Sequence, residues 1–292
     1  MDAPPRTGTP LVTTEWLAAH LDAPHVRVLD ATWFLPAERR DAHAEFLAGH
    51  VPGAVFFDID AVADRTTDLP HMLPPPEEFA AAVAALGIGD DDRVVVYDAQ
   101  GLVTAPRAWW TFRAFGHDDV AVLDGGLPKW RREGRPLATG PAAPVPARFT
   151  ARLDRAHVRT LADVRANLAS GREQVLDARP AARFRGEAPE PRPGLRAGHV
   201  PGSRNVPFTD VVDPATGTLR APAALAALFA AAGLAPDRPV VTTCGSGVTA
   251  AVLALALDVA GRHDVALYDG SWAEWGRPGD TPVETGDAVR PG

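Results

Sequence analysis

VVTTCGSGVTA, at residues 240–250, is a β-branched and apolar run that ends at Cys244, the only cysteine of the chain. Two glycines follow within three residues, and residues 248–259 are rich in Ala and Leu and contain neither Pro nor Gly. This order predicts a buried strand, a tight glycine loop and a helix. In an open parallel α/β sheet, such a loop lies at the carboxyl ends of the strands, where ligands bind.

Cys244 is therefore a candidate nucleophile. The glycines let successive backbone N–H groups point at one spot, and the helix N-terminus adds partial positive charge at the same spot. Both effects favour the thiolate, which is the reactive form of cysteine. The alternative is a buried and inert thiol, a common state of free cysteines.

The length of 292 residues is typical of two domains. The formal net charge of −8 favours neither nucleic acid nor an anionic membrane surface as a partner. No apolar run approaches the ~20 residues that span a bilayer, and the first residues, MDAPPRTGTP, lack the pattern of a signal peptide. One cysteine excludes an internal disulfide and a cysteine-based zinc site. We therefore expect a cytoplasmic protein.

Segments of the first half of the chain recur in the second half, in the same order. The matched pairs are VLDA at 28–31 and 175–178, GHVPG at 49–53 and 198–202, VVVYD at 94–98 and PVVTTC at 239–244, and VAVLDG at 120–125 and VALYDG at 265–270. Their nearly constant spacing indicates two copies of one domain rather than a solenoid. The match places Asp98 where the second copy has Cys244, so the first copy is expected to be catalytically silent.

Within each copy, β-rich runs alternate with helical stretches such as 76–86 and 222–232. This alternation predicts an α/β fold with two tandem domains, each a parallel sheet flanked by helices. The Pro- and Ala-rich stretch from Thr139 marks a linker. The expected boundaries are a silent domain at 1–138, a linker at 139–156 and a catalytic domain at 157–292. His50 and His199, in the Gly-Pro turns, are interpreted as structural, and the Asp-Gly pairs are assigned no chemistry.

The duplication with one cysteine in its second copy resembles the two-domain rhodanese sulfurtransferases. CGSGVT at 244–249 looks like the active loop of the 3-mercaptopyruvate sulfurtransferases. The thiosulfate-preferring rhodaneses usually carry basic residues where Gly245 and Ser246 stand. The resemblance covers nearly the whole chain, and it implies an inactive first rhodanese-like domain followed by an active second one.

The resemblance also implies roles for individual residues. Cys244 becomes a persulfide, and Arg183 and Arg192 hold the carboxylate and keto group of the substrate. A guanidinium binds a carboxylate in a fork geometry, which agrees with that role. Ser246 is combined with His71 and Asp60 in a proton relay. The loop residues expected to line the substrate site are Gly245, Gly247, Val248 and Thr249.

The implied reaction moves the sulfur of 3-mercaptopyruvate to an acceptor thiol, a thioredoxin or cyanide, and it requires no metal or organic cofactor. Two alternatives stay open, namely a thiosulfate:cyanide sulfurtransferase and a non-catalytic rhodanese-like sensing or scaffold protein. A cysteine-dependent phosphatase is disfavoured, because those enzymes place an arginine six residues after the cysteine, where this chain has Ala250.

Overall fold

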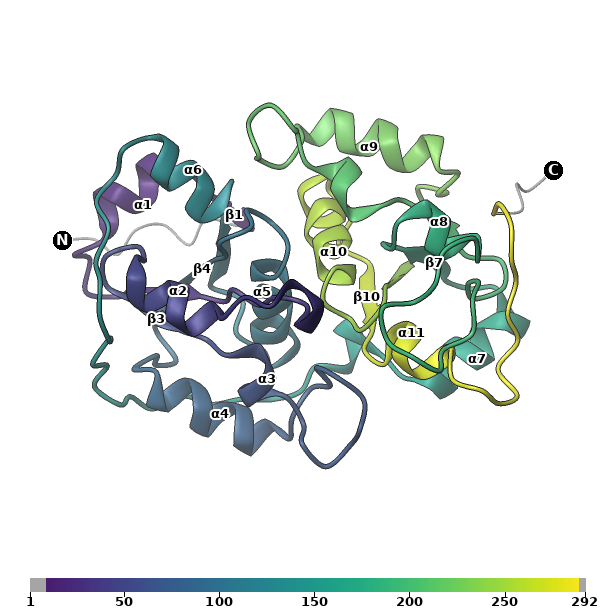
Figure 1. The fold of residues 1–292 in the computed structure, drawn as a ribbon, viewed down its shortest axis with the longest axis horizontal. Helices are drawn as coiled ribbons and strands as arrows, with labels where there is room; N and C mark the ends of the chain where they lie inside the picture. Colours follow the sequence, from purple (N-terminus) through teal and green to yellow (C-terminus); the bar gives the residue numbers. More distant parts are fainter. Residues whose placement is uncertain (1–8, 289–292) are drawn as a thin grey trace. The chain divides into compact units, whose positions relative to one another are not determined.

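The computed structural model describes residues 9–288, which divide into two compact units. Unit 1 is made of the residues up to 62 together with 75–153 and 214–218. Unit 2 is made of 63–74, 154–213 and the residues from 219 onward. Each unit is built around its own five-stranded sheet (Figure 1). Residues 63–74, here called the strap, therefore belong to unit 2 although they lie far upstream of its sheet.

Apart from the 3₁₀ helices and α3, the two units contain strands and helices in the same order. The strands and helices of unit 1 are β1 (Leu11–Val12), α1 (Thr14–His20), β2 (Val26–Asp30), the 3₁₀ helix η1 (Pro36–Glu38), α2 (Ala42–Ala48), β3 (Ala54–Phe56), α3 (Ile59–Val62), α4 (Pro76–Ala85), β4 (Arg93–Tyr97), α5 (Ala105–Ala114), β5 (Val120–Leu123) and α6 (Gly126–Arg132). Those of unit 2 are η2 (Arg155–His157), β6 (Val158–Arg159), α7 (Leu161–Ser170), β7 (Gln174–Asp177), α8 (Ala181–Phe184), β8 (Arg204–Asn205), η3 (Phe208–Val211), α9 (Pro222–Ala231), β9 (Val240–Thr243), α10 (Ala250–Val259), β10 (Val265–Tyr268) and α11 (Ser271–Trp275).

All strand pairs of both sheets are parallel. The strand order is β1-β5-β4-β2-β3 in unit 1 and β6-β10-β9-β7-β8 in unit 2. Strand for strand, these two orders are the same. The structure therefore confirms the predicted α/β fold with two tandem parallel-sheet domains.

Helices cover both faces of each sheet, as the buried strands of a parallel sheet require. In unit 1, α1 and α6 lie on one side of the strands and α4 on the other (Figure 1). Val28 and Val95 pack with Leu17 of α1 and Trp130 of α6 in one core cluster. In unit 2, residues 250–257 of α10 are all buried, which explains why this helix is apolar all round.

The central strands, β4 and β9, position the two loops that the repeat makes equivalent. β9 pairs with β7 on one side and with β10 on the other. Cys244 follows β9 directly, and Asp98 follows β4. Helix α10 begins at Ala250, two residues later than the Ala- and Leu-rich run predicts, because Val248 and Thr249 form the turn that leads into it.

His50 and His199, which occupy equivalent positions of the two repeats, make the same kind of structural contact. His50 stacks on Phe46 at a centroid distance of 4.0 Å, and His199 stacks on Phe184 at 3.7 Å. In each pair, Nδ1 of the histidine lies 2.8 Å from the carbonyl oxygen of that phenylalanine. Within residues 9–288, none of the helices has the length and apolar character needed to cross a membrane.

Candidate active site

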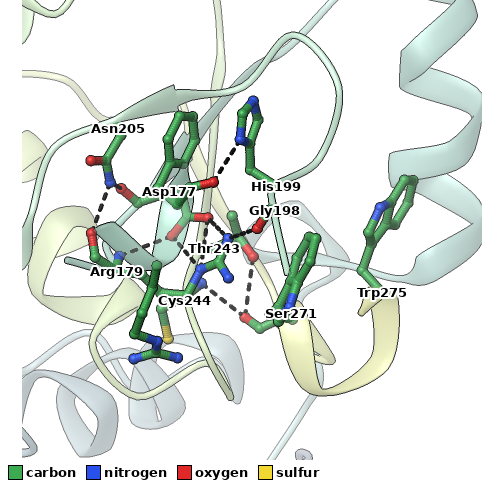
Figure 2. Close-up of polar contacts among 12 residues, drawn as sticks. Asp177, Arg179, Gly198, His199, Asn205, Thr243, Cys244, Ser271 and Trp275 are labelled. Carbon is green, nitrogen blue, oxygen red and sulfur yellow. Dashed lines mark hydrogen bonds and ion pairs between the residues drawn. The ribbon is translucent and has the colours of Figure 1, made fainter. Parts of the chain in front are cut away.

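Cys244 lies at the carboxyl end of β9, and the residue is only 2% exposed. Its backbone is fixed by residues 269–273, here called turn 269–273, which comprise the two residues after β10 and the first three residues of α11. The Cys244 N–H donates to Oγ of Ser271 at 3.2 Å, and the Cys244 carbonyl accepts from the Trp272 N–H at 2.9 Å. Figure 2 shows Ser271 beside Thr243 and Cys244. Turn 269–273 therefore anchors the cysteine loop at the carboxyl end of the central strand β9.

The loop after Cys244 depends on two glycines. Gly247 has a φ of 79°, in the left-handed region that favours glycine. A Cβ at Gly245 would lie 3.1 Å from Nη2 of Arg183 and 4.0 Å from Nη1 of Arg192, so a larger residue there would crowd the Arg183 guanidinium. Both predicted substrate arginines thus reach the loop directly beside the cysteine. Glycine at position 245 has no side chain, and this leaves room for the two guanidinium groups.

Ser246 and His71 also meet in unit 2. Nδ1 of His71 lies 3.1 Å from Oγ of Ser246 and 3.4 Å from the Ser246 carbonyl oxygen. Both residues are buried, with exposures of 4% for His71 and 6% for Ser246. A buried imidazole in contact with a hydroxyl next to a cysteine can move a proton at that position.

Asp60, the third residue of the predicted relay, belongs to α3 of unit 1. Its Oδ2 accepts a hydrogen bond from Nε1 of Trp33 at 2.7 Å, and its own N–H donates to Oδ1 of Asp58 at 3.0 Å. Both contacts lie within unit 1, whereas Ser246 and His71 belong to unit 2.

A buried ion network supports Arg183. Glu190 is 3% exposed at its side chain, and its carboxylate contacts both Arg183 and Arg179. The Arg183 Nε donates to Oε1 of Glu190 at 3.3 Å, a second bond joins Arg183 Nη2 to Oε2, and Arg179 Nη1 donates to Oε1 at 2.8 Å. One carboxylate therefore orients the arginine that lies beside the cysteine loop.

The network continues from Arg179 to the end of β7. The Arg179 guanidinium forms a bidentate pair with Asp177, with Nη2–Oδ2 at 2.6 Å, and donates to the Gly198 carbonyl at 2.8 Å (Figure 2). Burial opposes the charged form of Arg179, but the carboxylates of Asp177 and Glu190 outweigh it and raise the pKa of this guanidinium. Asn205 completes the network by donating to the carbonyls of Asp177 and Arg179, each at 2.8 Å.

The equivalent loop of unit 1 is filled by its own side chain. The Asp98 carboxylate accepts backbone N–H groups at distances from 2.6 to 2.9 Å, on Oδ1 from Gln100 and Gly101 and on Oδ2 from Val103, Thr104 and Ala105. The same type of loop that carries a thiol in unit 2 therefore binds an internal carboxylate in unit 1, which gives Asp98 a structural role.

Comparison with known proteins assigns the family. The family model described as the rhodanese-like domain matches residues 13–133 and again residues 160–277. The chain belongs to the rhodanese family. The first match runs from α1 to α6 and the second from α7 to α11, so each matched region covers one sheet except its first strand, β1 or β6.

Relatives of this chain align over nearly its whole length. The 3-mercaptopyruvate sulfurtransferase of Homo sapiens is 48% identical over 291 residues, which cover 97% of this chain and 98% of the human protein. The thiosulfate sulfurtransferase of Bos taurus is 45% identical over 272 residues, or 91% of each chain. Among solved structures, the 3-mercaptopyruvate sulfotransferase SseA of Escherichia coli matches with a TM-score of 0.83 at 44% identity, over 91% of this chain and 100% of that one.

Sequence reasoning missed several residues of the site, among them Glu190 and Ser271. Glu190 stands between Arg183 and Arg192 in the sequence, but its pairing with a buried arginine has no local signature. Ser271 has a φ of 48°, which is uncommon for a residue other than glycine and often marks a functional position. The repeated Asp-Gly pair at 269–270 was the available signal for the turn that both Asp269 and Ser271 belong to.

Proposed function

We propose that this chain is a 3-mercaptopyruvate sulfurtransferase, in which Cys244 carries the transferred sulfur. The observation that supports it most strongly is the place of Arg183 and Arg192, whose guanidinium groups both lie beside Gly245, directly after the cysteine. A small α-keto acid offers a carboxylate and a keto oxygen to such a pair, since each guanidinium presents several donors in a fixed plane. The full-length relatives of the same name support the assignment.

In the first half of the reaction, the Cys244 thiolate attacks the sulfur of 3-mercaptopyruvate. The new S–S bond forms as the carbon–sulfur bond breaks, and the electron pair passes to the carbon to give the enolate of pyruvate. Arg183 and Arg192 stabilise this enolate, and a proton supplied through Ser246 and His71 converts it to pyruvate. Cys244 is left as a persulfide, held within the loop of Gly245, Gly247, Val248 and Thr249.

In the second half, an acceptor removes the outer sulfur and restores the Cys244 thiolate. Covalent catalysis of this kind divides one difficult step into two easier ones. The acceptor in this proposal is a thiol, a thioredoxin or cyanide. The working arrangement is a silent domain at 1–138, a linker at 139–156 and a catalytic domain at 157–292, with Asp60 contributing to the proton relay from the first of these. A cytoplasmic location remains a prediction from the sequence.

Thiosulfate is the second candidate donor, because the bovine thiosulfate sulfurtransferase is 45% identical to this chain. Thiosulfate is a dianion, and basic side chains within the loop would favour it. This loop instead has Gly245 and Ser246 at those places. We therefore expect mercaptopyruvate to be the better donor.

The two donors are separated by measuring kcat/KM for each on one preparation, with cyanide as the common acceptor. The proposal predicts a higher kcat/KM for mercaptopyruvate. A higher value for thiosulfate would assign the chain to the second function, and no turnover of either donor would support a non-catalytic role.

A further inference from the structure

Turn 269–273 contacts the strap as well as the cysteine loop. Oδ2 of Asp269 accepts the N–H of Leu73 at 2.8 Å, a contact between residues 196 positions apart. Asp269 is only 4% exposed, so its carboxylate is withdrawn from water. A buried carboxylate that accepts a backbone N–H forms a charge-assisted hydrogen bond, which is about twice as strong as a neutral one.

His71, two residues before Leu73, depends on a fixed strap. Its φ of 62° is in the left-handed region, which costs a residue other than glycine roughly 1–2 kcal/mol. Such a conformation persists only where the surrounding structure imposes it. The imidazole must also stay within hydrogen-bond range of Ser246, and the present Nδ1–Oγ distance of 3.1 Å leaves little room for movement.

Two further contacts of the strap are local or exposed. The Asp64 N–H donates to the Met72 carbonyl at 2.9 Å, which closes the strap on itself. Asp68 at its tip pairs with Arg277 at 2.9 Å, but these side chains are 79% and 43% exposed. Exposed ion pairs contribute only about 0–1 kcal/mol. The buried bond from Leu73 to Asp269 is therefore the stronger attachment of the two.

We propose that Asp269 is a positioning residue, which fixes the strap and thereby holds His71 against Ser246. Turn 269–273 then places both halves of the site, since Ser271 and Trp272 hold the backbone of Cys244 and Asp269 holds the strap. The role in catalysis rests on the proposed function, whereas the anchoring of the strap does not.

The test combines hydrogen–deuterium exchange with kinetics on the full chain. In Asp269→Ala, the amides of the strap should exchange about tenfold faster than in the wild type. The kcat for mercaptopyruvate should fall roughly ten- to hundredfold, because a general acid–base group contributes about 10²–10⁴ and would be displaced rather than removed. The KM should change by less than about threefold, since Arg183 and Arg192 are untouched.

Two controls match this variant. Asp124→Ala changes the equivalent residue of the first repeat and should leave both strap exchange and kcat within about twofold of the wild type. Arg277→Ala removes only the exposed pair at the strap tip and should do the same.

Asp269→Asn keeps the side-chain volume and an acceptor oxygen, so it should restore most of the protection that Asp269→Ala loses. If Asp269→Ala does not fold, Asp269→Asn should still exchange its strap amides about twofold faster than the wild type, because its bond to Leu73 is no longer charge-assisted.

Unchanged strap exchange in Asp269→Ala, or in Asp269→Asn where that variant replaces it, would overturn the inference. Faster exchange with an unchanged kcat would show that the anchor does not position His71 for catalysis, and this would overturn the inference as well. The exchange measurement needs no substrate. A wild-type chain that fails to turn over mercaptopyruvate would therefore refute the proposed function. The anchoring of the strap could still be measured by hydrogen–deuterium exchange.

Discussion

Asp98 and Cys244 occupy the same position in two copies of one strand, loop and helix unit. Each follows the central strand of its sheet, β4 or β9, and each precedes a buried helix, α5 or α10. The carboxylate of Asp98 is bound by the N–H groups of its own loop. An uncharged thiol is a weak hydrogen-bond acceptor. The position that carries a strong hydrogen-bond acceptor in unit 1 therefore carries a weak one in unit 2.

Asp98→Asn should destabilise the chain but leave its chemistry largely intact. The amide NH₂ cannot accept hydrogen bonds, so at least two buried backbone N–H groups lose their acceptor. Each lost partner costs about 1–3 kcal/mol, so the free energy of unfolding should fall by roughly 2–6 kcal/mol. The kcat/KM should change by less than about tenfold, or 1.4 kcal/mol. Thermal denaturation and steady-state kinetics measure the two effects. A loss of several orders of magnitude in kcat/KM at unchanged stability would place Asp98 in the chemistry.

Arg183→Lys and Arg192→Lys should discriminate between the donors. Lysine keeps the charge but loses the bidentate fork. Loss of a charge-assisted contact of about 1.5–3 kcal/mol should lower kcat/KM for mercaptopyruvate roughly ten- to hundredfold. Thiosulfate has neither a carboxylate nor a keto group, so its kcat/KM should fall less. Equal losses for both donors would mean that the pair provides only general anion attraction.

Glu190→Gln should affect stability and donor binding together. Arg179 and Arg183 share this carboxylate, and Arg179 is almost fully buried. Breaking a buried ion pair costs about 3–5 kcal/mol, so chemical denaturation should show a loss of that order. Because Arg183 is no longer held, KM for mercaptopyruvate should rise.

Glu187→Gln is the matched control for Glu190→Gln. Glu187 lies in the same stretch and pairs with Arg185 at 2.7 Å, but its side chain is 56% exposed. The control should change stability by less than about 1 kcal/mol. If Glu190→Gln behaves like this control, the buried network has no role in orienting Arg183.

The fold and the nucleophile could be predicted from the sequence because their signals are local. The apolar run before Cys244, the glycines after it and the repeated segments all lie within short windows. Ser271 and Asp269 could not be predicted in the same way, because their partners, Cys244 and Leu73, are 27 and 196 residues away. No pattern along the chain indicates which buried amide will face a given carboxylate. The family resemblance supplied Arg183, Arg192 and His71, but not the contacts that hold them.

Cys244→Ser should abolish sulfur transfer while it leaves the fold intact. The side chain is small and buried, and the change replaces sulfur by oxygen. Serine lacks the thiolate that attacks the donor. Turnover of mercaptopyruvate should fall below detection, and the thermal denaturation midpoint should stay close to that of the wild type. A variant that is inactive because it is unfolded would be recognised by its circular dichroism spectrum.

The central claim is that Cys244 takes sulfur from 3-mercaptopyruvate. Intact-protein mass spectrometry after exposure to this donor, without an acceptor, tests the claim most directly. We predict that the wild-type chain gains the mass of one sulfur atom and releases one pyruvate per chain, and that cyanide then removes the added mass. Cys244→Ser should gain no mass under the same conditions. An unmodified wild-type chain, or added sulfur that persists in Cys244→Ser, would contradict the account.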